Sequence, residues 1–258
     1  MTEKLPVKRK LLAALVMTAG LATVISALGI PAAAKRAVPQ GAACRADELK
    51  GAMLPLELGT PLNLGGPEKA SCTLTGLRAM LGADNLFLIS YSSLNFFLFL
   101  FLVGSGRLRP AFLWCSAGTL LSVVMLVGDA LENRALYQWI DEARLAPGGP
   151  AFSMPPPSFL AVATNSKWIA IAVASLLCGV AYLLQRSRFL KPLIIPAVVC
   201  AGLVGLGVYR QDVDLIKYGM MSLTILWGFG LLHSIAVILQ PSLPTLGPVA
   251  GTAEPSHG

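Results

Sequence analysis

Residues 84–103 read DNLFLISYSSLNFFLFLFLV, and this stretch decides the class of the protein. A helix needs about 20 mostly apolar residues to cross the hydrocarbon core of a bilayer, and about 17 is the lower end. The stretch reaches that length with one carboxylic acid, Asp84, at its first position. Because backbone groups in lipid must find hydrogen bonds within the protein, the stretch is predicted to be a transmembrane helix.

Five further stretches meet the same requirement, so the sequence predicts an all-α integral membrane bundle of six transmembrane helices. The predicted spans are Leu11–Ile30, Asp84–Val103, Ala111–Gly128, Trp168–Leu184, Leu193–Val208 and Tyr218–Leu239. A membrane β-barrel would show alternating segments of about ten residues, and the sequence shows none.

The composition agrees with a membrane protein. Hydrophobic residues make up 55% of the 258 residues and charged residues 13%, whereas soluble domains carry about 25% charged residues. The net charge of +7 is typical of some nucleic-acid-binding proteins, but here the basic residues lie in short clusters beside apolar runs. That distribution is typical of membrane topology, so the expected partners are the lipid bilayer and a membrane protein, and no nucleic acid.

Basic residues predict the orientation. They stand almost without acids before the first span and in two short turns: Lys4, Lys8, Arg9 and Lys10, then Arg107 and Arg109, then Arg186, Arg188 and Lys191. By the positive-inside rule both termini are cytoplasmic. Residues 1–10 are then a cytoplasmic N-terminus, residues 31–83 and 129–167 are outside loops, and residues 240–258 are a disordered cytoplasmic tail.

An alternative reading concerns the first span. Basic residues 8–10, the apolar run and the small residues 32–34 also resemble a signal peptide with its cleavage site. Cleavage would leave five spans and an N-terminus outside. The apolar run is long for a signal peptide, which favours an uncleaved helix.

Cysteines point to an oxidising compartment. Cys44 and Cys72 both fall in the first outside loop, where a disulfide between them is expected and two free thiols are the alternative. Cys115, Cys178 and Cys200 lie within spans and are expected to be packing residues. A disulfide outside the membrane indicates a multi-pass protein of the bacterial cytoplasmic (inner) membrane.

Polar residues gather at the predicted outside ends of the helices. In the second span Asp84, Tyr91 and Asn95 share one helical face, and in the third span Asp129 and Glu132 are one turn apart on another. The candidate binding residues are Asp84, Tyr91, Asn95, Asp129, Glu132, Asn133, Lys167 and Arg210. Such a layer binds a cation or relays protons, or it is a structural ion-pair layer with Lys167 or Arg210, or a solvated rim.

Short motifs in this layer resemble those of a loose group of uncharacterised bacterial polytopic membrane proteins. The motifs are Asp84-Asn85-Leu86-Phe87, Gly128-Asp129-x-x-Glu132-Asn133 and Ser166-Lys167-Trp168. Asn85 stands where that group has an aromatic residue. The resemblance covers roughly residues 80–185 and implies no activity, only that Asp84, Asp129, Glu132, Asn133 and Lys167 act as a set.

No motif for a reaction is present. The sequence lacks GxxxxGK[ST], HExxH and GxSxG, and His233 stands alone within the last span, so no catalytic residue, metal site or cofactor is assigned. The favoured function is a non-enzymatic bundle that serves a partner, a lipid or envelope assembly. The alternatives are a small ion- or proton-coupled transporter and a membrane enzyme that acts on lipid at the outer interface.

Overall fold

The computed structural model describes residues 5–38, 41–58, 60, 62–105, 109–145, 153–154, 158–184 and 188–239. Its elements are α1 (Leu5–Ala37), α2 (Ala46–Glu57), β1 (Leu62–Asn63), α3 (Pro67–Ser105), α4 (Arg109–Leu145), β2 (Ser153–Met154), α5 (Ser158–Leu183), the 3-10 helix η1 (Arg188–Leu193), α6 (Ile194–Arg210) and α7 (Val213–Leu239). Six of these helices are long and apolar enough to cross a membrane. The chain is therefore an integral, multi-pass membrane protein, as predicted.

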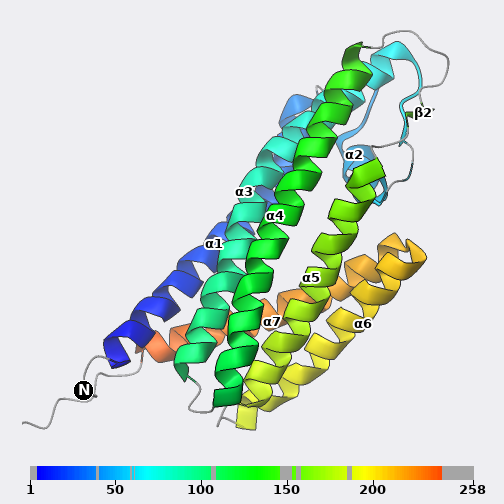
Figure 1. The fold of residues 1–258 in the computed structure, drawn as a ribbon. Coiled ribbons are helices and arrows are strands. Elements are labelled where there is room, and N and C mark those ends of the chain that lie inside the picture. Colours follow the sequence, from blue (N-terminus) through cyan, green and yellow to red (C-terminus); the bar gives the residue numbers. More distant parts are fainter. Residues whose placement is uncertain are drawn as a thin grey trace, which may run out of the picture.

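The six long helices form a closed ring. Each of α1, α3, α4, α5, α6 and α7 packs against the next, and α7 packs back against α1. Figure 1 shows that α2 and the β1–β2 pair lie at one end of this bundle, while α1 begins and α7 finishes at the other. We call these the α2 end and the opposite end.

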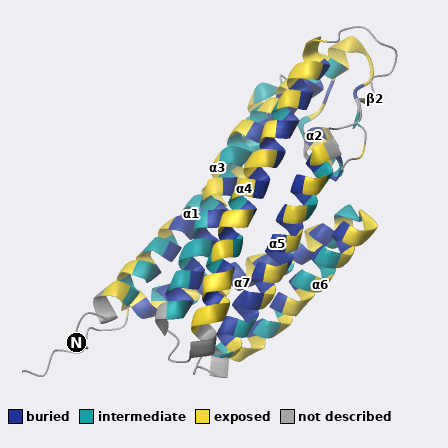
Figure 2. Ribbon diagram, in the orientation of Figure 1, coloured by how far each residue is buried: buried dark blue, intermediate teal, exposed yellow. Residues whose placement is uncertain are grey.

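Two helices are much longer than a bilayer is thick. The 39 residues of α3 and 37 residues of α4 span roughly 55 Å or more at about 1.5 Å per residue, against a hydrocarbon core of about 30 Å. At the α2 end their extensions bury a second apolar core with α2, in which Leu49, Leu77 and Trp139 are almost fully enclosed. The buried residues lie on the inner helix faces in Figure 2, both in this core and in the main one.

Much of the two segments predicted as outside loops, residues 31–83 and 129–167, is helical in the structure. The helix α1 continues through Pro31 because Ala34 packs into the second core, and α3 already begins at Pro67. Likewise α4 continues to Leu145 and α5 begins at Ser158, ten residues before the predicted start at Trp168. The predicted spans end short of these helix ends because the apolar faces of the extensions serve the second core rather than lipid.

A disulfide and a short ladder hold the α2 end together. Cys44 and Cys72 form a disulfide between the start of α2 and the start of α3, as the sequence predicted. Strand β1 pairs antiparallel with β2, which joins the segment after α2 to the connection between α4 and α5. The predicted tail at residues 240–258 lies outside the described residues, and the uncleaved first helix stays a prediction.

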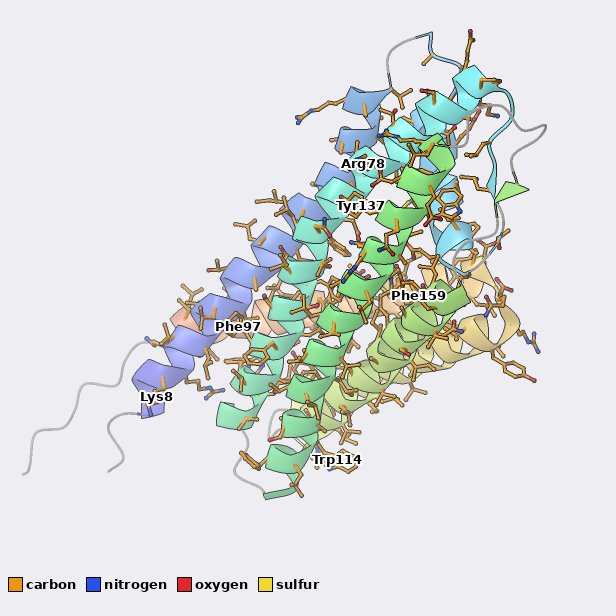
Figure 3. The ribbon with its side chains drawn as sticks, turned by 45° about the horizontal axis from the view of Figure 1, so that its top comes forward. Lys8, Arg78, Phe97, Trp114, Tyr137 and Phe159 are labelled. Carbon is orange, nitrogen blue, oxygen red and sulfur yellow. A yellow bond between two sulfur atoms is a disulfide. The ribbon has the colours of Figure 1, made fainter. Side chains whose placement is uncertain are left out.

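Exposed aromatic side chains lie near both ends of the membrane-spanning helices. Trp114 near the start of α4 and Phe159 near the start of α5 are both exposed, at opposite ends of this helix pair in Figure 3. Tyr209 and Tyr218 are exposed beside the turn between α6 and α7, at the α2 end. Trp and Tyr favour the interface between lipid and water, so we expect the α2-end boundary to lie near Tyr218.

Candidate functional site: a charged cluster beside a cavity

Lys167 is the centre of the polar layer. Its Nζ donates hydrogen bonds to Asp129 Oδ1 at 2.9 Å and to Glu132 Oε1 at 2.6 Å. A third carboxylate oxygen, Oε2 of Glu57, lies 3.7 Å from the same Nζ. The ammonium of lysine has three donor hydrogens and no acceptor; two of them are used by Asp129 and Glu132, and Glu57 lies beyond hydrogen-bond distance. We call Glu57, Asp84, Asp129, Glu132 and Lys167 the charged cluster.

Helix geometry brings these groups together. Asp129 and Glu132 are one turn apart on α4, so their side chains leave the same face. α5 packs along that face and presents Lys167 to both of them. Asp129, Glu132 and Lys167 are 4%, 1% and 5% exposed. An isolated charge buried to this degree is very costly, which explains why the lysine and both carboxylates are directly paired.

The second oxygen of each α4 carboxylate is also occupied. The hydroxyl of Tyr91 on α3 donates to Asp129 Oδ2 at 2.6 Å, and the hydroxyl of Thr164 on α5 donates to Glu132 Oε2 at 2.6 Å. Both carboxylates are therefore held from two directions. A carboxylate with both oxygens engaged in this way is positioned by its neighbours and has less freedom to act as an acid or base on a substrate.

Asp84 belongs to a neighbouring amide network. Asn133 Nδ2 donates to Asp84 Oδ2 at 2.9 Å and to Asn85 Oδ1 at 3.0 Å. Asn85 Nδ2 in turn donates to the hydroxyl of Tyr137 at 3.4 Å. Tyr137 also lies under the guanidinium of Arg78, and both are labelled in Figure 3 on the extensions of α3 and α4. The network links the membrane part of α3 and α4 to the second core.

Asn95 ends the polar layer on the side away from α2. Its Nδ2 donates to the backbone carbonyl of Tyr91 at 2.9 Å, and its Oδ1 accepts from Trp227 Nε1 of α7 at 3.2 Å. Asn95 thus ties α3 to α7 and touches the charged cluster only through Tyr91. Arg210, by contrast, is exposed at the end of α6 and has no ion pair among the described residues. It therefore lies apart from the other residues of the layer in which the sequence analysis placed it.

Sequence analysis missed Glu57, Thr164 and Trp227. Glu57 is the last residue of α2, and its side chain is 14% exposed where α2 lies against α5. Burial raises the pKa of Glu57 well above its ordinary range; Lys167 opposes this, and the other three carboxylates of the cluster reinforce it. Thr164 carried a usable signal, because it precedes Lys167 by one helical turn once α5 is known to begin at Ser158.

A cavity of about 230 Å³ lies beside the charged cluster, and it is partly open. Residues from α2, α3, α4, α5 and α7 line it, including Met53, Glu57, Asp84, Tyr91, Lys167, Trp168, Met220 and Trp227. Aromatic rings form much of its wall, since Tyr91 lies 5.1 Å from Phe87 and 6.2 Å from Trp227 between ring centroids. We call this space the α2-end cavity.

A separate aromatic group lies toward the opposite end. Phe101 contacts His233 with ring centroids 4.9 Å apart, Tyr182 lies 6.4 Å from His233, and the guanidinium of Arg9 lies over Phe101. Between this group and Asn95 the residues of α3 are Phe96 to Leu100, all apolar. The polar layer therefore does not continue to His233 along this helix.

The geometry permits proton sharing and the binding of a cation. Among the residues that the structure describes, no group of three or more His, Cys, Asp or Glu side chains is arranged to hold a metal ion. The chain matches no protein-family model, no curated protein and no solved structure. The function must therefore be argued from the cluster and the cavity themselves.

Proposed function

We propose that this protein is a non-enzymatic membrane binding protein that holds a lipid by its head group in the α2-end cavity. The observation that supports this most is the pairing of a buried charged cluster with a partly open cavity at the α2 end of the bundle. The cluster fixes α3, α4 and α5 around the space, and α2 covers it with Met53 and Leu54. A small head group fits this volume, since pockets for drug-sized ligands start at about 300 Å³.

Transport is less well supported by the same geometry. A transport pathway requires polar or hydrated groups that continue across the bilayer. Here Asn95 is satisfied by Trp227 and by the backbone of Tyr91, and an apolar run follows it on α3.

Catalysis on lipid is less well supported because of the hydrogen bonds already made. Asp129 and Glu132 are the buried candidates for an acid or base at this site, and each has both carboxylate oxygens engaged by Lys167 and a hydroxyl. A general base must reach the proton that it removes, which would require these bonds to break.

A pair of neighbouring methionines on α7 tests the proposal. Met220 lines the cavity, whereas Met221 is 65% exposed and faces away from it. Met220→Trp should fill the cavity, and Met221→Trp serves as the matched control with the same change in size. Native mass spectrometry of each protein, released from its own membranes, measures the retained lipid.

We expect a stoichiometric lipid adduct on the wild type and on Met221→Trp, and loss of most of it on Met220→Trp. The melting temperature of each protein in detergent confirms that the variants fold. Equal adducts on all three proteins would contradict the proposal, and so would a bare wild-type protein.

A further inference from the structure

The α2-end cavity has an excess of carboxylic acids. The charged cluster contains Glu57, Asp84, Asp129 and Glu132 against the single ammonium of Lys167. Lys167 is committed to Asp129 and Glu132 by short hydrogen bonds, which leaves the other two carboxylic acids only partly satisfied. The charges of this cluster therefore do not balance without protons or a further cation.

The two less satisfied acids both line the cavity. The polar contact of Glu57 within the described residues is its 3.7 Å approach to Lys167, which is longer than a hydrogen bond. Asp84 accepts one bond from Asn133 on Oδ2. Free carboxylate lone pairs that face a cavity are the feature that recognises a cationic donor.

The aromatic wall also favours a cation. Lys167 shows the arrangement within the protein itself, because its ammonium lies 4.9 Å from the centroid of the Trp168 ring while it contacts carboxylates. Tyr91 and Trp227 offer further ring faces along the same cavity. Ammonium groups bind the faces of Trp and Tyr at such distances, and organic ammonium ions are recognised by this combination.

Trp168 supplies a second, independent observation. It lines the cavity, is 7% exposed, and its Nε1 is buried without a hydrogen-bond partner among the described residues. An indole N–H only donates, so it needs an oxygen acceptor rather than an ammonium. A buried donor of this kind needs an acceptor, and a ligand in the cavity that Trp168 lines would supply one.

We infer that the occupant of the α2-end cavity carries an ammonium group with an oxygen acceptor close to it, as ethanolamine does. This inference rests on the proposed function and names its ligand class. The ammonium lies between Glu57 and Asp84 against the aromatic wall, and the oxygen accepts from Trp168 Nε1. The source is an aminophospholipid, whose head group lies at the depth marked by Tyr218, or a free amino alcohol.

The test compares lipids and free amines on the full chain. Nanodiscs that contain phosphatidylethanolamine and phosphatidylglycerol in equal amounts present both head groups, and native mass spectrometry reports which one the protein retains. In detergent, a thermal shift titration with ethanolamine, and with ethylene glycol as the uncharged analogue, reports binding of the free amine. Glu57→Gln is the test variant, and Glu48→Gln on an exposed part of the same helix is its control.

We expect the wild type and Glu48→Gln to retain phosphatidylethanolamine over phosphatidylglycerol, and Glu57→Gln to bind it about tenfold more weakly, the typical effect of losing a hydrogen bond to a charged group. Trp168→Phe keeps the ring but removes the N–H donor, so it should weaken ethanolamine more than methylammonium. Stabilisation by free ethanolamine without a lipid preference would support the same chemistry from a soluble source.

Two outcomes overturn the inference and separate it from the proposed function. If the wild type retains both lipids equally and gains no stability from free ethanolamine, while Met220→Trp still releases the lipids, the cavity binds lipid but not through an ammonium group. If the wild type binds neither lipid nor amine, the inference and the proposed function both fail.

Discussion

Glu57 joins the charged cluster from α2, whereas Asp84, Asp129 and Glu132 are carried by the membrane-spanning helices. Its pKa is raised mainly by burial, and the facing groups are Lys167 on α5, the two carboxylic acids of α4 and Asp84 on α3. A carboxyl group whose pKa is higher in the folded protein than in the unfolded chain binds more protons when folded. Its contribution to stability is therefore complete at low pH and is lost as the pH rises through the folded pKa.

The first prediction follows from this sign. Glu57→Gln keeps the size of the side chain and cannot ionise, so the variant should not lose this stability as the pH rises. Relative to the wild type, the variant should gain about 1.4 kcal/mol per pH unit above pH 4.3 until the folded pKa is passed. Thermal unfolding in detergent between pH 4 and pH 8 measures the difference, with Glu48→Gln as control. A constant difference across this range would show that Glu57 ionises as an exposed acid does.

Residues of the cluster differ in how far the sequence could predict them. Asp129, Glu132 and Lys167 could be found because carboxylic acids and a lysine near apolar spans need partners. Glu57 could not, because nothing in the local sequence places the end of α2 against α5. Arg210 is exposed in the structure and lies apart from the charged cluster, because span ends alone do not say which way a side chain faces.

At the scale of helices, close packing in this bundle depends on particular glycines. A Cβ added at Gly219 of α7 would lie 2.5 Å from Val204 Cγ2 and 3.1 Å from the backbone nitrogen of the same residue on α6. At Gly228 of the same helix an added Cβ would meet nothing within 4 Å. The two positions are chemically alike in sequence, and only the fold distinguishes them.

Gly219→Ala and Gly228→Ala should therefore have opposite effects. The first forces α6 and α7 apart and should cost about 1–3 kcal/mol, as overpacking does. The second restricts the unfolded chain without a clash and should stabilise by about 0.5–1 kcal/mol. Denaturation of the purified proteins in mixed micelles gives both values. Similar effects of the two changes would contradict the contact between α6 and α7.

The positions of the helices were predictable, but their lengths were not. The run after Asp84 is mostly apolar because one side faces lipid and the other packs against protein. It lies within α3, as predicted. The extension back to Pro67 carries charged residues such as Lys69 and Arg78, which mask its apolar face in a sequence. Its helical structure depends on contacts with α2 and α4, which only the folded chain supplies.

At the scale of the whole molecule, the orientation in the membrane stays a prediction. The positive-inside rule was read from short basic turns, which lie at the opposite end. The α2 end also carries basic residues, some paired with acids, such as Lys69 with Glu48 and Arg78 with Asp141. The charge count is therefore less decisive than the sequence suggested. The Cys44–Cys72 disulfide at the α2 end is the stronger argument, because disulfides persist in oxidising compartments.

Labelling of single cysteines in intact cells tests that orientation. Glu142→Cys places an exposed thiol near the end of α4, at the α2 end, and Lys191→Cys places one in η1, at the opposite end. The free native cysteines among the described residues are buried, so they contribute little background. With the α2 end outside, an impermeant maleimide should label the first variant in intact cells and the second only after lysis.

The reverse labelling pattern would show that the protein has the opposite orientation in the membrane. This would change which leaflet and which ligands the cavity can reach. The α2-end cavity would then open to the cytoplasmic leaflet, and the disulfide would have to survive a reducing compartment. Labelling of both sites in intact cells, with a cytoplasmic marker protein unlabelled, would instead contradict the six-span topology. An odd number of crossings between α4 and η1 requires the two thiols to lie on opposite sides, and α5 is the helix that connects them.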